Sequence, residues 1–419
     1  MSDLRPMATV VRSQPDRAGF KAYRRGTHRT VDPATTLARV QPYLAAMGIT
    51  RIANVTGLDR IGVPVVMVCR PNSRSLAVSQ GKGLTLDAAK ASGVMEAIEL
   101  YHGERIERPL TLGSVRDLGA RHRLVDLDRL PPRTESRFHL NLQLLWIEGR
   151  DLLSDEPVWL PYEVVHTNYT LPFPSGSGCF IDHTNGLASG NDLIEAINHG
   201  ICEVVERDST AIWNHLGRQS RDRARLELRT IEDDDCVEIL DKLRRADFEV
   251  AAWDTTTDVG IASFYCLIFD QRDEWAHIGA GAGAHPSRSV ALLRALTEAV
   301  QVRTTYITGS RDDLPPDHFT APTIQQKLQR ARALMATRAA GRHFGQVPTY
   351  ESTTVGDDLA WILARLRSAG IEEVIALDLT LPEFGIPVAR VVIPGLEGPD
   401  EHPACLAGER GRMVAEKQP

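Results

Sequence analysis

The 419-residue sequence has no cysteine pair at metal-binding or redox spacing and no long apolar run. Its six cysteines lie far apart, without a Cys-x-x-Cys motif or the Cys/His spacing of zinc sites. In so long a chain this favours free thiols in a reducing compartment. No segment reaches the roughly 18 consecutive apolar residues of a membrane helix, and the polar N-terminus lacks the apolar core of a secretory signal. We therefore expect a cytoplasmic protein that has no membrane partner.

An excess of positive charge is also missing. The chain has 48 Lys and Arg residues against 55 Asp and Glu residues, which gives a formal net charge of −7. Because nucleic-acid phosphates bind to basic surfaces, this balance argues against nucleic acid as the main partner. The acidic surplus is small for the length of the chain, so the positions of the carboxylates matter more than their number.

The common nucleotide-binding and nucleophile motifs are absent as well. Gly81-Lys82-Gly83 lacks the frame of a phosphate-binding loop. Gly279-Ala-Gly-Ala-Gly283 has the spacing G-x-G-x-G in place of G-x-G-x-x-G, and a close-packing turn explains it better. No serine lies in a G-x-S-x-G elbow, so a Ser/His/Asp triad has no support. A nucleotide would have to bind by other means.

Strands followed by long helices predict an α/β or α+β fold of enzyme size. A loose tail is expected over 1–20 and an irregular polar tail over 396–419. A helix should begin with Asp32 as N-cap and Pro33 as first residue and run to about Met47. Strands are expected at about 51–55, 63–69, 75–79, 143–147, 158–161, 248–254, 373–377 and 388–393, with a hairpin over 261–279. The three longest helices should cover about 87–103, 192–216 and 287–309.

The three long helices carry polar faces rich in carboxylates. At about 100° per residue, one face of the first helix holds Ser92, Glu96 and Glu99. The matching face of the second holds Asn191, Glu195, His199, Glu203 and Glu206, and that of the third holds Arg294, Glu298, Gln301 and Thr305. Apolar residues occupy the opposite sides.

Any one of these faces alone would be taken as ordinary solvated surface. Solvated faces usually mix Lys with Glu, however, because like charges four residues apart destabilise a helix. The first two faces stack carboxylates with almost no lysine. Carboxylates brought together need protons or cations, and several hard oxygen ligands favour Mg²⁺, which typically arrives with a phosphate ligand. The sequence therefore predicts a magnesium–nucleotide site.

The pattern of these residues resembles the YcaO-domain family. The matching stretches extend over about residues 20–395 and are Ser79-Gln-Gly-Lys-Gly83, Ser92-x-x-x-Glu96-x-x-Glu99, Asn185-Gly-Leu-Ala-Ser-Gly190, Glu203-Val-Val-Glu-Arg207 and Ala295-Leu-Thr-Glu298-x-x-Gln301-x-Arg303. The resemblance implies an ATP-binding fold with mixed sheets over residues 21–395, with ATP and Mg²⁺ as cofactors. It implies an enzyme that phosphorylates the oxygen of a peptide backbone amide after a nucleophile has added to its carbon.

The resemblance also assigns roles to residues. Magnesium would be held by Glu96, Glu99, Glu195, Glu203 and Glu206, and all of these except Glu195 would be catalytic. The nucleotide would be contacted by Lys21, Ser92, Glu99, Asn191, Arg207, Glu298 and Arg303. The helical faces support the carboxylates independently, whereas Arg303 projects away from Glu298 and is open to a structural ion pair. Lys82 is likewise open to the packing of a turn. The family often has Glu-Arg-Tyr where Glu99 is followed by Leu100-Tyr101, so one arginine contact is absent or is supplied from elsewhere.

Three N-terminal segments, 26–29, 48–51 and 58–64, resemble a branch of the family that works with a TfuA-type partner and installs thioamides. Sulfide as nucleophile leaves a thioamide, whereas a Cys, Ser or Thr side chain leaves an azoline ring. The C-terminus lacks the Pro-x-Pro-x-Pro pattern that azoline-forming members often have. The resemblance thus favours a thioamide synthetase that acts on a precursor or protein peptide, with a TfuA-type partner and a sulfide donor. Family members are often homodimers, but the sequence leaves the oligomeric state open.

Two alternatives stay open. One is an azoline-forming cyclodehydratase that uses a separate recruiting protein. The other is a peptide-binding scaffold without catalysis, although such a protein has no reason to keep carboxylates that repel one another.

Overall fold

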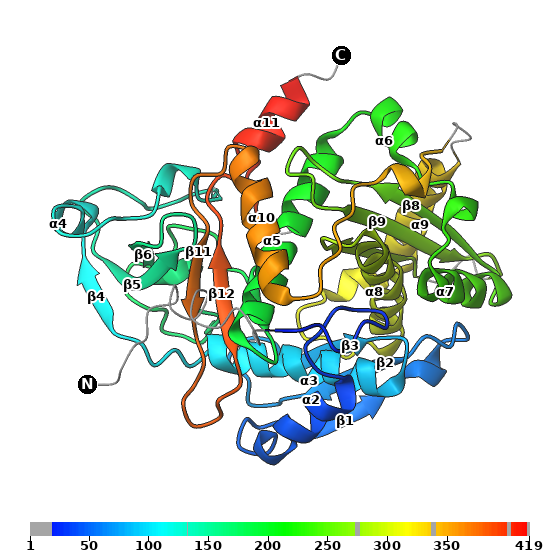
Figure 1. Ribbon diagram of the computed structural model, residues 1–419, viewed down its shortest axis with the longest axis horizontal. Coiled ribbons are helices and arrows are strands. Elements are labelled where there is room, and N and C mark those ends of the chain that lie inside the picture. Colours follow the sequence, from blue (N-terminus) through cyan, green and yellow to red (C-terminus); the bar gives the residue numbers. More distant parts are fainter. Residues whose placement is uncertain (1–18, 132, 273–276, 337–340, 400–403, 417–419) are drawn as a thin grey trace.

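The structure is a computed structural model that describes residues 19–131, 133–272, 277–336, 341–399 and 404–416 (Figure 1). The α-helices are α2 (Pro33–Val40), α3 (Leu86–Gly103), α4 (Val115–Gly119), α5 (Leu193–His215), α6 (Arg218–Ala224), α7 (Asp234–Arg245), α8 (Arg288–Thr308), α9 (Ala321–Met335), α10 (Val355–Ser368) and α11 (Glu409–Glu416). The strands are β1 (Arg51–Asn54), β2 (Val65–Cys69), β3 (Val78–Lys82), β4 (Leu110–Gly113), β5 (Leu144–Asp151), β6 (Pro157–Pro161), β7 (Leu187–Ser189), β8 (Phe248–Asp254), β9 (Ser263–Asp270), β10 (Gly279–Ala284), β11 (Ile375–Asp378) and β12 (Val388–Val392). Within these residues no helix has the length and apolar character needed to cross a membrane.

The strands form three sheets with the orders β1-β2-β3, β10-β9-β8 and β4-β5-β11-β12-β7, the last with β6 also paired to β5. The predicted combination of sheets with long helices is confirmed. All pairs of these strands are antiparallel, although mixed sheets were expected. Figure 1 shows α3, α5 and α8 lying between the sheets, where apolar sides of α5 and α8 join two separate hydrophobic cores.

Glycines let β10 lie directly on α8. A Cβ atom on Gly281 would lie only 2.3 Å from the carbonyl oxygen of Ala295, and the glycines at the two neighbouring odd positions of the strand would meet α8 carbonyls at 2.1 and 2.2 Å. Only a residue without a side chain permits such an approach. The sequence expectation of close packing at 279–283 is therefore right, but the segment is a strand and not a turn.

The other two long helices are seated in a similar way. A Cβ atom on Gly81 of β3 would lie 2.0 Å from the carbonyl oxygen of Ala89 on α3. On α5, a Cβ atom on Gly200 would lie 2.9 Å from the carbonyl oxygen of Gly186, which comes just before β7. Each polar helix is thus fixed by close contact between backbones.

Several boundaries differ from the sequence expectation, among them the three that follow. The first helix does begin at Pro33 with Asp32 as N-cap, but it ends at Val40 because Pro42 has no N–H for the helical ladder. The third strand begins at Val78, three residues late. The segment 396–419 is not irregular throughout, since it contains α11. The expected tail at 1–20 falls almost entirely outside the described residues.

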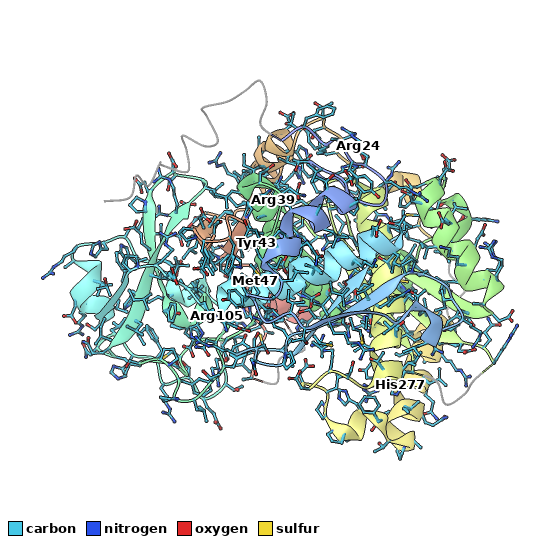
Figure 2. The ribbon with its side chains drawn as sticks, turned by 90° about the horizontal axis from the view of Figure 1, so that it is seen from below. Arg24, Arg39, Tyr43, Met47, Arg105 and His277 are labelled. Carbon is cyan, nitrogen blue, oxygen red and sulfur yellow. The ribbon has the colours of Figure 1, made fainter. Side chains whose placement is uncertain are left out.

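Side chains of α2 and of the residues just after it, labelled in Figure 2, contact the start of α5 and the loop between β11 and β12. Arg39 donates to the carbonyl oxygens of Asn191 and Gly385 at 2.7 and 2.9 Å. Tyr43, just after α2, packs edge-on against Phe384 with ring centroids 5.5 Å apart. These contacts join the residues before the first sheet to the loop between β11 and β12.

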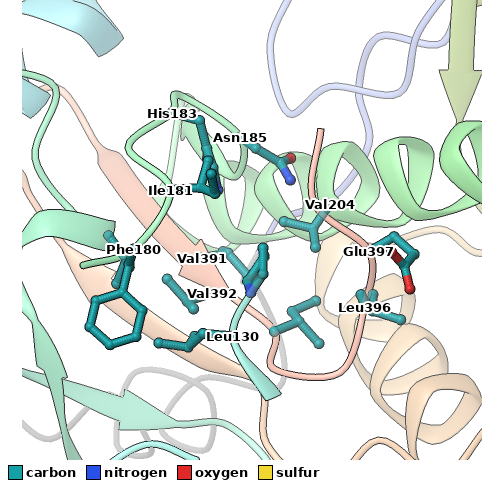
Figure 3. Close-up of a pocket in the computed structure, with 13 residues that line it drawn as sticks. Leu130, Phe180, Ile181, His183, Asn185, Val204, Val391, Val392, Leu396 and Glu397 are labelled. Atoms are coloured by element: carbon teal, nitrogen blue, oxygen red, sulfur yellow. The ribbon is translucent and has the colours of Figure 1, made fainter. Parts of the chain in front are cut away.

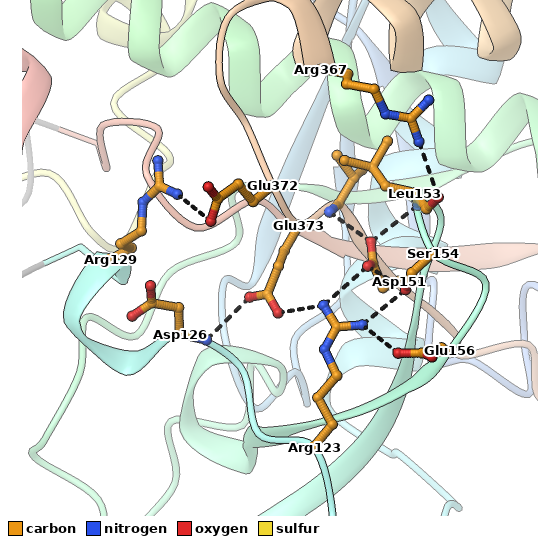
Figure 4. A network of polar contacts seen from close by, with 11 residues as sticks. Arg123, Asp126, Arg129, Asp151, Leu153, Ser154, Glu156, Arg367, Glu372 and Glu373 are labelled. Carbon is orange, nitrogen blue, oxygen red and sulfur yellow. Dashed lines mark hydrogen bonds and ion pairs between the residues drawn. The ribbon is translucent and has the colours of Figure 1, made fainter.

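A polar network around Arg123 joins the β5–β6 hairpin to the start of β11 (Figure 4). Arg123 contacts Asp151 at 3.2 Å, Glu156 at 3.2 Å and Glu373 at 2.8 Å. The fully buried Asp151 also accepts the backbone N–H of Val374 at 3.1 Å. Because buried charges need partners, this network fixes one end of the large sheet far from the acidic helices.

The strand–helix contact at α8 predicts a large effect of a single methyl group. Gly281→Ala forces β10 or α8 to move, and we expect it to lower the free energy of unfolding by about 1–3 kcal/mol. Gly57→Ala is the matched control, because nothing lies within 4 Å of a Cβ atom there. Urea denaturation of both variants measures the difference; equal stabilities would contradict the close packing.

Candidate functional site

Five carboxylates from the three long helices act on one another. They are Glu96 and Glu99 on α3, Glu203 and Glu206 on α5, and Glu298 on α8. Four of them keep part of their side chain accessible, while Glu206 is buried. Their immediate helix neighbours on the apolar sides are fully buried. The polar faces predicted from the sequence therefore converge on one place.

The pKa values of four of these carboxyls are raised; that of Glu206 rises through burial first and then through the charge of Glu298. Burial raises the pKa of Glu96 to about 7, and the charge of Glu203 adds to this rise. Burial raises the pKa of Glu99 to about 8, with Glu96 and Glu203 adding to it. Burial and then Glu206 raise the pKa of Glu203 to about 7. At neutral pH the cluster therefore holds protons that a divalent cation would displace.

Hydrogen bonds from strand ends orient two of the carboxylates. The backbone N–H and the hydroxyl of Ser189, at the end of β7, donate to the same oxygen of Glu99 at 2.8 and 2.7 Å. The backbone N–H of Ala284, at the end of β10, donates to Glu206 at 3.2 Å. Each carboxylate is thus fixed through one of its two oxygens.

Cations surround the α5 and α8 part of the cluster. Lys82 lies 2.6 Å from Glu298, and Arg207 lies 4.0 Å from Glu206. Burial opposes the ionisation of Glu298, but Lys82, Arg207 and Arg294 outweigh it and hold its pKa below the usual value. Lys82 therefore does more than pack a turn. Carboxylates beside Lys and Arg can hold a metal ion together with a phosphate group.

Glu195 does not join the cluster, and its expected role as a metal ligand is not supported. One of its oxygens accepts from the backbone and side-chain amides of Asn191 at 3.1 and 2.9 Å and from Arg29 at 3.3 Å. The other accepts from the N–H and hydroxyl of Thr30 at 2.8 and 3.0 Å. Both oxygens are therefore engaged at the first turn of α5. Glu195 and Asn191 bind the N-terminal segment.

Two expected nucleotide contacts lie in different environments. Ser92 is exposed on α3, one turn before Glu96, and stays a prediction. Lys21 is instead buried, and its ammonium group lies 2.6 Å from Asp358. This pair anchors the N-terminal segment to α10, so the ammonium group is not free to reach a phosphate.

Asp358 also lies near His28 and His285, and one ligand atom of each of the three lies within 4.8 Å of the others. The Lys21 ammonium group already neutralises Asp358. In addition, Nδ1 of His285 accepts the backbone N–H of Ser287 at 3.0 Å. Both features disfavour a metal ion in this cluster.

Arg303 makes structural ion pairs in this structure, and its nucleotide contact stays a prediction. Its Nε lies 2.7 Å from Asp59, its Nη2 lies 3.5 Å from Asp270, and its Nη1 donates to the carbonyl oxygen of His277 at 2.7 Å. The helical wheel already indicated that it projects away from Glu298. The structure supports the second of the two sequence interpretations, an ion pair.

This arrangement predicts that Arg303→Met destabilises the protein without weakening nucleotide binding. The variant leaves the buried Asp59 without its cation, and we expect the free energy of unfolding to fall by about 3 kcal/mol. Arg116→Met, at an exposed arginine, is the control. Thermal unfolding and calorimetric titration with a magnesium–ATP analogue measure both quantities; a lost affinity at full stability would restore the nucleotide role.

The raised pKa values predict how the metal-free protein responds to pH. Because the pKa values of Glu96, Glu99 and Glu203 lie above the usual 4.5, the folded protein binds protons that the unfolded chain releases. Their contribution to stability is complete below about pH 4.5 and declines as the pH rises through 7 to 8. We therefore expect the melting temperature of the protein in a chelator to fall as the pH rises from about 4.5 to about 8.

Glu99→Gln should flatten that fall, because it removes the group with the highest of the three pKa values. Glu107→Gln, at an exposed carboxylate just after α3, should leave the slope as it is. Melting temperatures across the pH series test this, and an unchanged slope in Glu99→Gln would contradict the clustering.

Sequence reasoning missed two contributors. Ser189 lies inside the motif Asn185–Gly190, but only the structure shows that it fixes Glu99. Arg311, after α8, is one of the charges that oppose the raised pKa of Glu96, and burial is the larger effect there. The periodicity of α8 ends before Arg311, so no helical face could have indicated it.

Comparisons with known proteins agree with this geometry. A family model described as YcaO cyclodehydratase, ATP- and Mg²⁺-binding, matches residues 80–397. A protein of Rhizobium leguminosarum bv. trifolii, described as uncharacterized and in the tfuA 3' region, is 34% identical over 385 residues, covering 88% of each chain. An uncharacterized protein of Methanothermobacter thermautotrophicus is 34% identical over 391 residues, covering 88% of this chain and 95% of its own.

Solved structures share the fold. A YcaO from Methanopyrus kandleri bound with AMPPCP and Mg²⁺ superposes with a TM-score of 0.72 at 24% identity, over 93% of this chain and 99% of that one. A heterocyclase in complex with substrate and cofactor superposes with a TM-score of 0.75 at 23% identity, over 92% of this chain. The chain spans about half of that heterocyclase, 54% of its length.

Proposed function

Because the chain belongs to the YcaO family, we propose that it uses ATP and Mg²⁺ to activate a peptide backbone amide by phosphorylating its oxygen, with sulfide as the nucleophile and a thioamide as the product. Family membership itself rests on the match over residues 80–397 and on the relatives at 34% identity. The observation that carries the proposal is the convergence of five carboxylates from three helices beside Lys82, Arg207 and Arg294.

The donor set fits magnesium. Glu96, Glu99, Glu203 and Glu206 offer hard oxygen ligands, and burial raises the pKa values of the first three, so a divalent cation bound there would favour their ionised forms. Magnesium bound there would neutralise the charge of the phosphate groups during transfer. Glu298, which Lys82 contacts, would lie at the nucleotide side of the same cluster.

The residues of the chain would position the reactants. Lys82, Arg207 and Arg294 can bind phosphate oxygens, and Ser189 and Ala284 hold two of the carboxylates in place. In the reaction, hydrosulfide adds to the amide carbon and the carbonyl π electrons move to the oxygen. That oxygen attacks the γ-phosphorus and ADP leaves. Hydrogen phosphate then departs with the proton of the S–H group, which leaves the C=S bond.

The choice of the thioamide branch is supported by the relative in the tfuA 3' region. A TfuA-type partner, a sulfide donor, a peptide substrate and a homodimer are parts of this proposal. The azoline-forming cyclodehydratase is the second candidate, because the matching family model is described as a cyclodehydratase. The raised pKa values argue against a scaffold without catalysis, since a scaffold gains nothing from carboxylates that repel one another.

Product mass separates the two enzyme candidates. The protein is incubated with ATP, Mg²⁺, a TfuA-type partner and a precursor peptide encoded beside its gene, with and without sulfide. A thioamide adds about 16 Da to the peptide and requires sulfide, whereas an azoline removes about 18 Da and does not. Calorimetric titration with Mg²⁺ and AMPPCP is the first step, and an absence of Mg²⁺-dependent binding would refute both candidates.

Glu203→Gln tests the metal assignment. Removing one carboxylate from the cluster should weaken Mg²⁺-dependent AMPPCP binding at least about 10-fold and abolish the mass change. The exposed Glu107→Gln should bind as the wild type does. Full activity in the Glu203→Gln protein would contradict the assignment.

A further inference from the structure

Arg390 is fully buried in the middle of β12, and no described carboxylate neutralises it. It pairs with Leu377 of β11 on one side and with Leu187 of β7 on the other, and its side chain is 0% exposed. Within the described residues, no Asp or Glu oxygen lies within 4.0 Å of its guanidinium group. A buried cation without a counter-charge costs several kcal/mol of stability. The other fully buried arginine, Arg70, is paired with Glu104.

The guanidinium group is held by only one of its three nitrogens. Nη2 donates to the carbonyl oxygens of Val164 at 2.8 Å and of His183 at 2.9 Å. No described residue accepts a hydrogen bond from Nε or Nη1, although both atoms are buried. The planar group therefore presents unused donors in a fixed orientation. Burial lowers the pKa of Arg390 to about 10, so the group is still charged at neutral pH.

The charge of Arg390 acts on the acidic cluster from the large sheet. Burial sets the pKa of Glu203 most strongly, and Arg390 is among the cations that oppose this rise. Lys82 and Arg294 approach the cluster from β3 and α8 instead. The two residues whose carbonyls hold Arg390 line a small cavity that also borders Val204, the neighbour of Glu203 (Figure 3).

We propose that Arg390 binds an oxyanion of the reacting groups through Nε and Nη1. This inference rests on the proposed function, in which two oxyanions meet at the magnesium carboxylates. One is the amide oxygen, which becomes negative when the nucleophile adds, and the other is an oxygen of the γ-phosphate. Charge-assisted hydrogen bonds from a guanidinium group suit both. An incoming anion would supply the counter-charge that the folded protein lacks.

Arg390→Met separates this role from a structural one. The variant removes an uncompensated buried charge but also the donor to the carbonyl oxygens of Val164 and His183, so we expect the melting temperature to change little. Orthovanadate with Mg²⁺ and ADP is the probe, because it presents oxygens at both the phosphoryl and the acceptor positions. Vanadate binding by Arg390→Met should be about 10- to 100-fold weaker, which is the loss expected when a hydrogen bond to a charged group is removed. Arg390→Lys, which keeps the charge, should recover part of the loss.

Binding of Mg²⁺ with AMPPCP identifies the oxyanion. If the affinity for AMPPCP is unchanged in Arg390→Met, the bound group is the acceptor oxygen; if it falls as much as vanadate binding does, the group is the γ-phosphate. Arg70→Met is the matched control and should lower the melting temperature while vanadate binding by the folded protein is retained.

Unchanged vanadate binding in Arg390→Met would overturn the inference, as would a loss of binding that only follows a loss of stability. If the wild-type protein does not bind AMPPCP with Mg²⁺ at all, the proposed function fails and this inference fails with it. If the wild type binds AMPPCP and vanadate and Arg390→Met binds both equally well, only the inference about Arg390 fails.

Discussion

Repulsion among carboxylates that are removed from water is the constraint on which the rest of the structure depends. Glu96, Glu99, Glu203 and Glu206 raise the free energy of one another's ionised forms. Surface helices would relieve such repulsion by moving apart or by turning toward solvent. Here close packing opposes such movement, because the backbones of α3 and α8 lie against glycines of β3 and β10, and Gly200 of α5 lies against Gly186, the residue before β7. The free energy needed to bring these carboxylates together is offset by this close packing and by the apolar cores in which the helices take part.

The charges around the cluster divide it into two parts. On the α5 and α8 side, Lys82, Arg207 and Arg294 hold the pKa of Glu298 below its usual value, while burial and the charge of Glu298 raise the pKa of Glu206 despite these cations. On the α3 side, burial raises the pKa of Glu96 to about 7, against Arg311 and Lys82, and that of Glu99 to about 8. Part of the net charge of −7 is therefore concentrated at one place where cations would bind.

The helices and their polar faces could be predicted from the sequence because a periodicity of 3.6 residues needs no tertiary information. The four carboxylates Glu96, Glu99, Glu203 and Glu206 follow from it, as does the doubt about Arg303. The partners of Glu195 could not be predicted, because Arg29 and Thr30 come from a distant segment without periodicity. The partner of Lys21 could not be predicted for the same reason, since Asp358 lies on α10; the metal role of Glu195 and the nucleotide role of Lys21 stay predictions.

Strand positions and lone residues were harder to predict. The alternating glycines of β10 are typical both of a turn and of a strand packed closely on a helix. Only the contact with α8 distinguishes the two. Arg390 has apolar neighbours on both sides in the sequence, which predicts a buried strand and gives no sign of an unpaired cation. Long-range contacts decide such cases, and one sequence does not contain them.

Proton release on metal binding tests the central claim most directly. Isothermal titration of the protein with Mg²⁺ and AMPPCP, in buffers of different ionisation enthalpy, gives the number of protons released per site. The account predicts a net release near pH 7, because Glu96, Glu99 and Glu203 lose their protons to the metal, and a release that falls toward zero near pH 9, above their pKa values. Binding that releases no protons at pH 7, or that does not need Mg²⁺, would contradict it.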